Sequence, residues 1–279
     1  MRNQSFQNML PPRVDKRDKL PEEPHTSKTV NKPIEACEGY SCSSNSSGSS
    51  NLEIVHKNKE KNKGMSKSSK LMRFKADDWV FTQVTAITSA KKTKDGKVSQ
   101  NSFQYVNTNG IAISNEDLLK YYKSFIGSHN YKDHEQEVSK SYGVVLDAVI
   151  RPVNKTGDTV YYVDLLIATN RHKDPAWARA IETQKVKYVS MGADSSSIQC
   201  SKCGNIAVKD TDICEHLLFE TGLFYIDKDG NKQITSGWIS DKKSDYSIGS
   251  IEFEEISYLT VSPAYRASAL SYVIPVPKN

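Results

Sequence analysis

The chain has 279 residues, of which 37% are hydrophobic, enough for one core of ordinary size with a small satellite module. It lacks the run of about 18 apolar residues that a membrane-spanning helix needs, and its first residues are polar, so we expect neither a membrane span nor a secretory signal. The net charge of +5 is uneven, because residues 1–75 carry 15 Lys/Arg and 8 Asp/Glu while the remainder carries 23 and 25.

Residues 1–73 are predicted to form a disordered basic tail rich in serine, proline and lysine. Residues 41–50 are almost all serine, asparagine and glycine, and residues 57–70 are rich in lysine. Such a composition buries too little apolar surface to offset the entropy of the chain. A basic tail on a near-neutral body can attract nucleic acid or acidic protein, or it can be solvated and have no partner.

Order is expected from Phe74 onward. A stretch rich in β-branched and aromatic residues predicts a strand over residues 78–87. Ser114 then has the side chain of a helix N-cap, and apolar residues at helical spacing predict a helix over residues 116–125. Gly127 is expected to end this helix.

The middle of the chain alternates between strand and helix patterns. A loop that holds His129 and His134 is followed by strands predicted at residues 142–150 and 160–168, and then by a helix over residues 176–184. The last element predicted is a strand over residues 251–261, stopped by a proline, and residues 199–250 before it are expected to form an irregular insert.

A short strand through Val189 is predicted to end at Ser190 and to meet Gly192. A serine hydroxyl is a poor nucleophile until a base takes its proton and the backbone fixes its direction. A strand end fixes that direction, and a nearby glycine lets a reacting carbonyl approach the backbone N–H groups that bind an oxyanion. Most Ser-x-Gly triplets are ordinary turns, so the case for a nucleophile depends on the rest of the chain.

The insert contains a second chemical pattern. Cys200 and Cys203 form a Cys-x-x-Cys-Gly motif, and Cys214 and His216 follow shortly after it. A structural Zn²⁺ takes four nitrogen or sulfur ligands in a tetrahedron, and these residues supply that number. An odd total of five cysteines also favours reduced thiols and a metal over a disulfide framework. The Cys-x-His spacing is shorter than usual for zinc, which leaves the fourth ligand open.

Taken together, the order of elements resembles that of the prohead maturation proteases of tailed phages, relatives of the herpesvirus assemblins. The residues that carry the resemblance are the glycine-marked strand Ser141–Val145 after the histidine loop, the helix Trp177–Ile181, the segment Tyr188–Gly192, and the strand Phe253–Leu259 leading into Ser262-Pro263-Ala264. The resemblance covers roughly residues 74–270, and it lies in the order of four motifs more than in any single one.

The resemblance implies roles for individual residues. His134 matches the family's base and Ser190 its nucleophile, 56 positions further along the chain. His129 is the other candidate base, but its spacing fits less well. Glu255 lies in the matching last strand and is the first choice for the group that orients the base. The alternatives are Asp194 and His216, and a zinc-bound His216 would not be free for that role.

The fold class expected is α+β, with a mainly antiparallel, barrel-like β core, flanking helices and a zinc-binding insert over residues 199–250 in a domain of residues 74–279. The resemblance implies a serine endopeptidase that cleaves scaffold and major capsid proteins and itself inside an assembling prohead in the host cytoplasm. The sequence leaves its oligomeric state open, a homo-oligomer included. The alternative is a catalytically inactive capsid or scaffold protein with a structural zinc module. A third reading, a zinc-knuckle nucleic-acid binder, has few aromatic residues among the tail lysines to support it.

Overall fold

The computed structural model describes residues 51–54, 72–155, 157–241 and 250–275. Most of the predicted disordered tail therefore lies outside the described residues. Strand β1 (Asn51–Ile54) is the exception, because it pairs antiparallel with β2 (Met72–Lys75) and so departs from the expected disorder.

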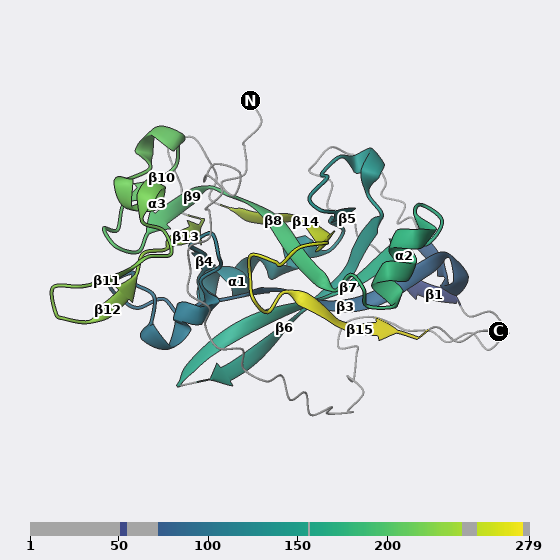
Figure 1. Ribbon diagram of the computed structural model, residues 1–279, viewed down its shortest axis with the longest axis horizontal. Coiled ribbons are helices and arrows are strands. Elements are labelled where there is room, and N and C mark those ends of the chain that lie inside the picture. The colour runs from purple at the N-terminus through teal and green to yellow at the C-terminus, as the bar shows by residue number, and fades with distance from the viewer. Residues whose placement is uncertain (1–50, 55–71, 156, 242–249, 276–279) are drawn as a thin grey trace, which may run out of the picture.

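Seven strands close into a barrel in the order β14-β5-β6-β7-β3-β15-β8 (Figure 1). All neighbouring strands are antiparallel except β14 and β5. Closure leaves no unpaired sheet edge, and it confirms the expectation of a mainly antiparallel, barrel-like core. The barrel strands are β3 (Trp79–Thr88), β5 (His129–Lys132), β6 (Gly143–Lys155), β7 (Asp158–Asn170), β8 (Tyr188–Ser195), β14 (Ile251–Leu259) and β15 (Ala269–Ile274).

The interior of the barrel is filled by side chains from strands on opposite walls. Tyr258 of β14 and Thr82 of β3 are fully buried, and their hydroxyl oxygens lie 2.5 Å apart although their strands are not neighbours. Met191 of β8 and Ile256 of β14 belong to the same apolar core. Because side chains alternate along a strand, the residues on either side of Met191 and Ile256 face away from this core.

The two longer helices begin where side chains can cap them. Ser114 precedes α1 (Asn115–Tyr121) and Asp174 precedes α2 (Pro175–Glu182), and each accepts the backbone N–H three residues on, at 3.0 and 2.9 Å. The helix predicted to run to residue 125 changes to the 3-10 helix η4 (Tyr122–Phe125) after α1. The other 3-10 helices among the described residues are η2 (Ala76–Asp78), η3 (Gln100–Tyr105), η5 (Val138–Lys140) and η6 (Asp210–Asp212).

The insert is more regular than expected, and it is tied to the body. A four-stranded sheet has the order β10-β9-β13-β4, in which β13 pairs parallel with β4 from the first half of the chain. Trp238 of β13 is fully buried there. These elements gather at one end of the molecule, with α2 at the other (Figure 1). They are β4 (Ile111–Ile113), β9 (Ser197–Cys200), β10 (Ile206–Ala207), α3 (Glu215–Phe219), β11 (Phe224–Ile226), β12 (Lys232–Ile234) and β13 (Gly237–Ser240).

Strands β4, β5 and β15 were not predicted from the sequence, and neither were β1 and β2 in the expected tail or the short strands of the insert. The segment that holds His129, expected to be a loop, is β5, whereas His134 follows it in a turn. Within the described ranges, no helix is long and apolar enough to cross a membrane.

Candidate active site and metal centre

Ser190 lies inside a strand and not at its end. Strand β8 continues through Gly192 to Ser195 because β14 pairs with it along its whole length, from Tyr188 to Ser195. The expectation that a turn at Ser190 supplies N–H groups for an oxyanion is therefore wrong. The ladder with β14 still holds the Ser190 backbone in one fixed direction.

The residues around Ser190 share the face of β8 and β14 that points away from the barrel core. Ser257 is the register partner of Ser190, and Glu255 is the partner of Gly192. Directly opposed residues of an antiparallel pair have Cβ atoms about 4.5–5.5 Å apart on the same face. The barrel thus brings Ser190 of β8 beside Ser257 and Glu255 of β14, from a distant part of the sequence.

His134 reaches this face from the turn after β5. The backbone φ angles of Asp133 and His134 are 47° and 63°, a left-handed conformation that costs side-chain-bearing residues about 1–3 kcal/mol each. Asp133 ties the turn to the end of β14, because its N–H donates to the Tyr258 carbonyl at 3.0 Å and its carboxylate accepts the Thr260 N–H at 2.8 Å. These bonds hold the strained turn beside β14.

In this position His134 meets Glu255. The distance from His134 Nδ1 to Glu255 Oε1 is 2.6 Å, and the Glu255 side chain is almost fully buried. A carboxylate at the Nδ1 side of a histidine orients the ring and leaves Nε2 for proton transfer. The pair expected from the sequence, a base and the group that orients it, is in hydrogen-bond contact.

The Glu255 carboxylate also raises the pKa of His134 above its ordinary value. The hydrogen bond to Glu255 is the largest cause, burial opposes it, and the negative charges of Glu255 and Asp133 add to the increase. His134 consequently holds its proton to a higher pH than an isolated histidine does.

The alternative orienting residues lie elsewhere. Asp194 interacts with Glu254. Burial and the negative charge of Asp194 raise the pKa of Glu254 to about 7. His216 belongs to the cysteine cluster described below. Of the three candidates for this role, Glu255 is the one that contacts His134.

Ser190 and His134, the candidate nucleophile and base, are not hydrogen-bonded in this structure. Within the described part of the chain, the Ser190 hydroxyl forms no hydrogen bond to His134 or to His129. His129 instead has its Nδ1 atom 3.0 Å from Ser141 Oγ. Ser190 is 8% exposed and lies on the same face as the carboxylate that contacts His134.

Two further residues touch this site that the sequence did not indicate. Gln136 Nε2 donates to Glu255 Oε1 at 2.9 Å, and Ser257 Oγ donates to Glu255 Oε2 at 2.5 Å. Ser257 could have been found, because residues two apart on a strand share a face. Nothing in the sequence around Gln136 indicated its role, since a positive-φ turn places it. A separate cavity of about 460 Å³ lies beside α2 and includes none of these residues.

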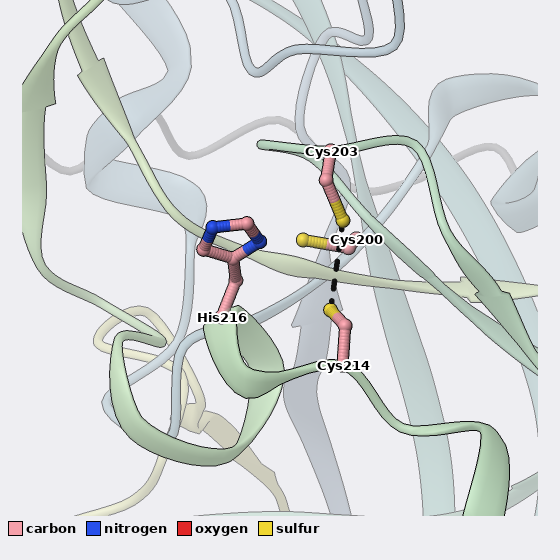
Figure 2. Close-up of side chains that lie close together, drawn as sticks. All are labelled: Cys200, Cys203, Cys214 and His216. Atoms are coloured by element: carbon pink, nitrogen blue, oxygen red, sulfur yellow. Dashed lines mark hydrogen bonds between the residues drawn. The ribbon is translucent and has the colours of Figure 1, made fainter.

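The four predicted metal ligands lie together at the other site (Figure 2). The candidate ligand atoms of Cys200, Cys203, Cys214 and His216 are all within 4.8 Å of one another. The Sγ atoms of Cys203 and Cys214 are 3.6 Å apart. A tetrahedral ion with metal–sulfur bonds of about 2.3 Å separates its sulfurs by roughly 3.8 Å. The cluster therefore has the dimensions of a metal site.

His216 provides an independent indication. Its Nδ1 atom is buried, and it has no hydrogen-bond partner among the described residues. Figure 2 shows that the ring nitrogen next to the point of attachment faces the three sulfurs. A buried nitrogen without a partner is costly, and a bound metal satisfies it. The donor set Cys₃His can thus bind a metal, with His216 as the fourth ligand.

The thiols of the cluster are in unlike environments. Burial raises the pKa of Cys200 to about 12. Burial opposes ionisation of Cys203 too, but the Asn205 N–H and the side chains of His216 and Cys214 outweigh it and lower the pKa of Cys203 to about 7. A metal binds thiolates, so its binding releases protons from such a cluster.

Comparison of the chain with known protein families, with curated proteins and with solved structures gave no match.

Proposed function

We propose that this chain is a serine endopeptidase with Ser190 as the nucleophile, His134 as the base and Glu255 as the group that orients it. The observation that supports this most is the 2.6 Å contact between His134 Nδ1 and Glu255 Oε1, which joins residues 121 positions apart. Both were candidates for these roles from the resemblance to prohead maturation proteases, and the closed barrel agrees with the core expected from the sequence.

In this mechanism the Ser190 oxygen attacks the carbonyl carbon of a peptide bond, and His134 Nε2 takes the hydroxyl proton. The protonated ring, paired with Glu255, then gives the proton to the leaving amine, and water hydrolyses the acyl-enzyme by the same route. The step requires the His134 ring to approach Ser190. Catalytic hydrogen bonds of this kind are often long without substrate and shorten when it binds.

The substrates and the setting follow from the resemblance alone. They are scaffold and major capsid proteins and the chain itself, cleaved inside an assembling prohead in the host cytoplasm. The second candidate function, an inactive capsid or scaffold protein, is favoured by one observation. Ser190 and His134 share a face, but no hydrogen bond joins them within the described ranges.

For the Cys₃His cluster we propose a structural Zn²⁺. Zinc suits a closed tetrahedral set of thiolate and imidazole ligands, and four protein ligands leave no position for a reacting water. Cys200 ends β9, Cys203 lies in the turn after it, and Cys214 directly precedes α3. One ion at this point would hold α3 against the four-stranded sheet.

Two experiments test the catalytic proposal. The full chain and its Ser190→Ala variant are expressed with a scaffold protein, and shortening of either protein is followed by mass spectrometry. Ser195→Ala, the same change further along β8, is the matched control. Shortening in wild type and Ser195→Ala but not in Ser190→Ala is expected, and equal shortening in all three refutes the proposal.

The second experiment needs no knowledge of the substrate. A fluorophosphonate reacts with serines that are activated by a base, so it should label Ser190 in wild type and not in His134→Ala. Labelling that persists without His134, or that maps to another serine, would favour the inactive alternative. Peptide mapping gives the labelled position directly.

A further inference from the structure

The Glu255 carboxylate is buried, but each of its oxygens has a partner. Glu255 is 1% exposed. Oε1 lies 2.6 Å from His134 Nδ1 and accepts from Gln136 Nε2 at 2.9 Å, and Oε2 accepts from Ser257 Oγ at 2.5 Å. A buried carboxylate is costly unless donors of this kind surround it. Gln136 and Ser257 thus restrict the carboxylate to the orientation in which one oxygen faces the histidine.

Gly192 provides the space for this arrangement. A Cβ atom at position 192 would lie 2.8 Å from Glu255 Cγ, 2.9 Å from Glu255 Oε1 and 3.0 Å from Gln136 Nε2. The backbone of Gly192 is not in the left-handed region, so it is not the backbone conformation that requires glycine here. The glycine is needed because the Glu255 side chain lies directly over it.

We propose that Gln136, Ser257 and Gly192 are positioning residues that fix the Glu255 carboxylate. The fixed carboxylate in turn holds neutral His134 in the tautomer that carries its proton on Nδ1, with Nε2 free of hydrogen. The use of that free Nε2 to take the Ser190 proton rests on the proposed function. The tautomer itself does not.

The tautomer is a sensitive measure of this positioning. Which nitrogen of a neutral histidine carries the proton is decided by the hydrogen bond that the ring makes. Two acidic groups act on the His134 ring, Glu255 from β14 and Asp133 from its own turn. Asp133 is bound to Thr260 instead, so the short bond to the ring comes from Glu255. Loss of the Glu255 orientation should therefore release the Nδ1 proton.

The test is nitrogen-15 NMR of the full chain labelled in histidine, with the His134 signals assigned by their absence in His134→Gln. Wild type is expected to show the Nδ1–H tautomer above the pKa of His134. Ser257→Ala and Gln136→Ala should shift His134 toward the Nε2–H tautomer and lower its pKa toward the ordinary value. Ser257→Thr keeps the hydroxyl and should keep the wild-type spectrum. Glu135→Ala, in the same exposed turn but without contact to Glu255, is the control.

Activity is measured in parallel. Loss of one hydrogen bond to the carboxylate should lower kcat by roughly 10- to 100-fold with little change in KM. Because Gln136 is exposed, its variant keeps the test available if Ser257→Ala does not fold.

The outcomes separate this inference from the proposed function. An unchanged tautomer and pKa in both Ser257→Ala and Gln136→Ala overturns the inference, even if Ser190→Ala abolishes cleavage. Cleavage that survives Ser190→Ala overturns the proposed function, whatever the spectra show. A shifted tautomer in both variants, restored in Ser257→Thr, supports the inference.

Discussion

The metal cluster and the candidate catalytic face differ in how they draw residues from the chain. The cluster takes its four side chains from Cys200 to His216, within one turn, one short helix and the end of one strand. The candidate catalytic face joins His134 to Glu255 across 121 positions, and Ser190 comes from a third segment between them. The first needs only local folding, whereas the second exists only when the barrel closes.

This difference implies that a substitution at one site should not affect the other. Figure 1 shows the elements of the cluster at one end of the molecule, and β8 runs toward that end from the side of α2. A substitution in the candidate catalytic face should abolish peptide cleavage and leave the bound metal in place. A change in the cluster should first affect the end of the molecule to which β13 and β4 belong.

The largest effect is expected from His134→Gln. A glutamine cannot take the Ser190 proton, so the rate of peptide cleavage should fall by about 10⁴-fold or more. The His134 side chain is 41% exposed, but its hydrogen bond to the buried Glu255 is lost, so Tm should fall only modestly. Metal content, measured by elemental analysis on the same sample, should stay equal to that of wild type. A parallel loss of metal would show that the two sites are coupled.

Next in size is the loss of the metal. Cys203→Ser removes one ligand, and a structural zinc contributes its binding free energy directly to folding, so Tm should fall by several degrees or more. Elemental analysis should show loss of bound zinc. Protection of α3 against hydrogen exchange should be lost before that of the barrel strands. Cys37→Ser, which changes a cysteine of the N-terminal tail and not of this cluster, is the matched control. Equal Tm and equal metal content in Cys203→Ser and Cys37→Ser would disprove the structural role.

The same difference explains which features were accessible from the sequence. The Cys-x-x-Cys motif and the nearby histidine lie close together in the sequence, so all four residues of the cluster were named as candidate ligands, with the fourth left open. The helix start at Ser114, a helix over residues 176–184 and the long strands β3, β6 and β7 were also predicted. Helix caps and runs of β-branched residues are local signals.

The resemblance named His134 and Glu255 as a pair, but other features that depend on a distant partner were missed or wrong. Ser190 was expected at a strand end because Gly192 resembled a turn residue, yet β14 pairs with β8 beyond it. Gly192 instead leaves room for the side chain of Glu255, a residue 63 positions away in the sequence. Strand β5 has only four residues and a polar sequence, so only its place between β14 and β6 makes it a strand. Residue patterns do not contain this information.

A smaller effect, on both stability and cleavage, is expected from Gly192→Ala. The new methyl group would press on the Glu255 side chain, and such overpacking typically costs about 1–3 kcal/mol in the free energy of unfolding. Cleavage should also fall, because the carboxylate moves away from His134. Denaturant unfolding and kcat are the measurements. Ala193→Gly, the neighbouring position facing the core, should lower stability through lost burial but leave the His134 signals unchanged.

The smallest effect concerns pH. His134 must be neutral to act as a base, and the hydrogen bond to Glu255 raises its pKa, so the rise of kcat/KM with pH should lie above the ordinary histidine value of about 6.5. The same bond stabilises the fold most when His134 is protonated. This stabilisation should be complete below the unfolded-state pKa and lost as pH rises through the folded-state value.

Glu255→Gln separates this contribution from others, because it keeps the shape of the side chain and removes its charge. The residual activity of the variant should rise at lower pH than that of wild type, and its stability should depend less on pH in the same range. Identical pH midpoints for wild type and Glu255→Gln would mean that the carboxylate does not act on the titrating histidine. The 2.6 Å contact between His134 and Glu255 would then contribute to folding alone. The face around Ser190 would in that case be structural, as the metal cluster is.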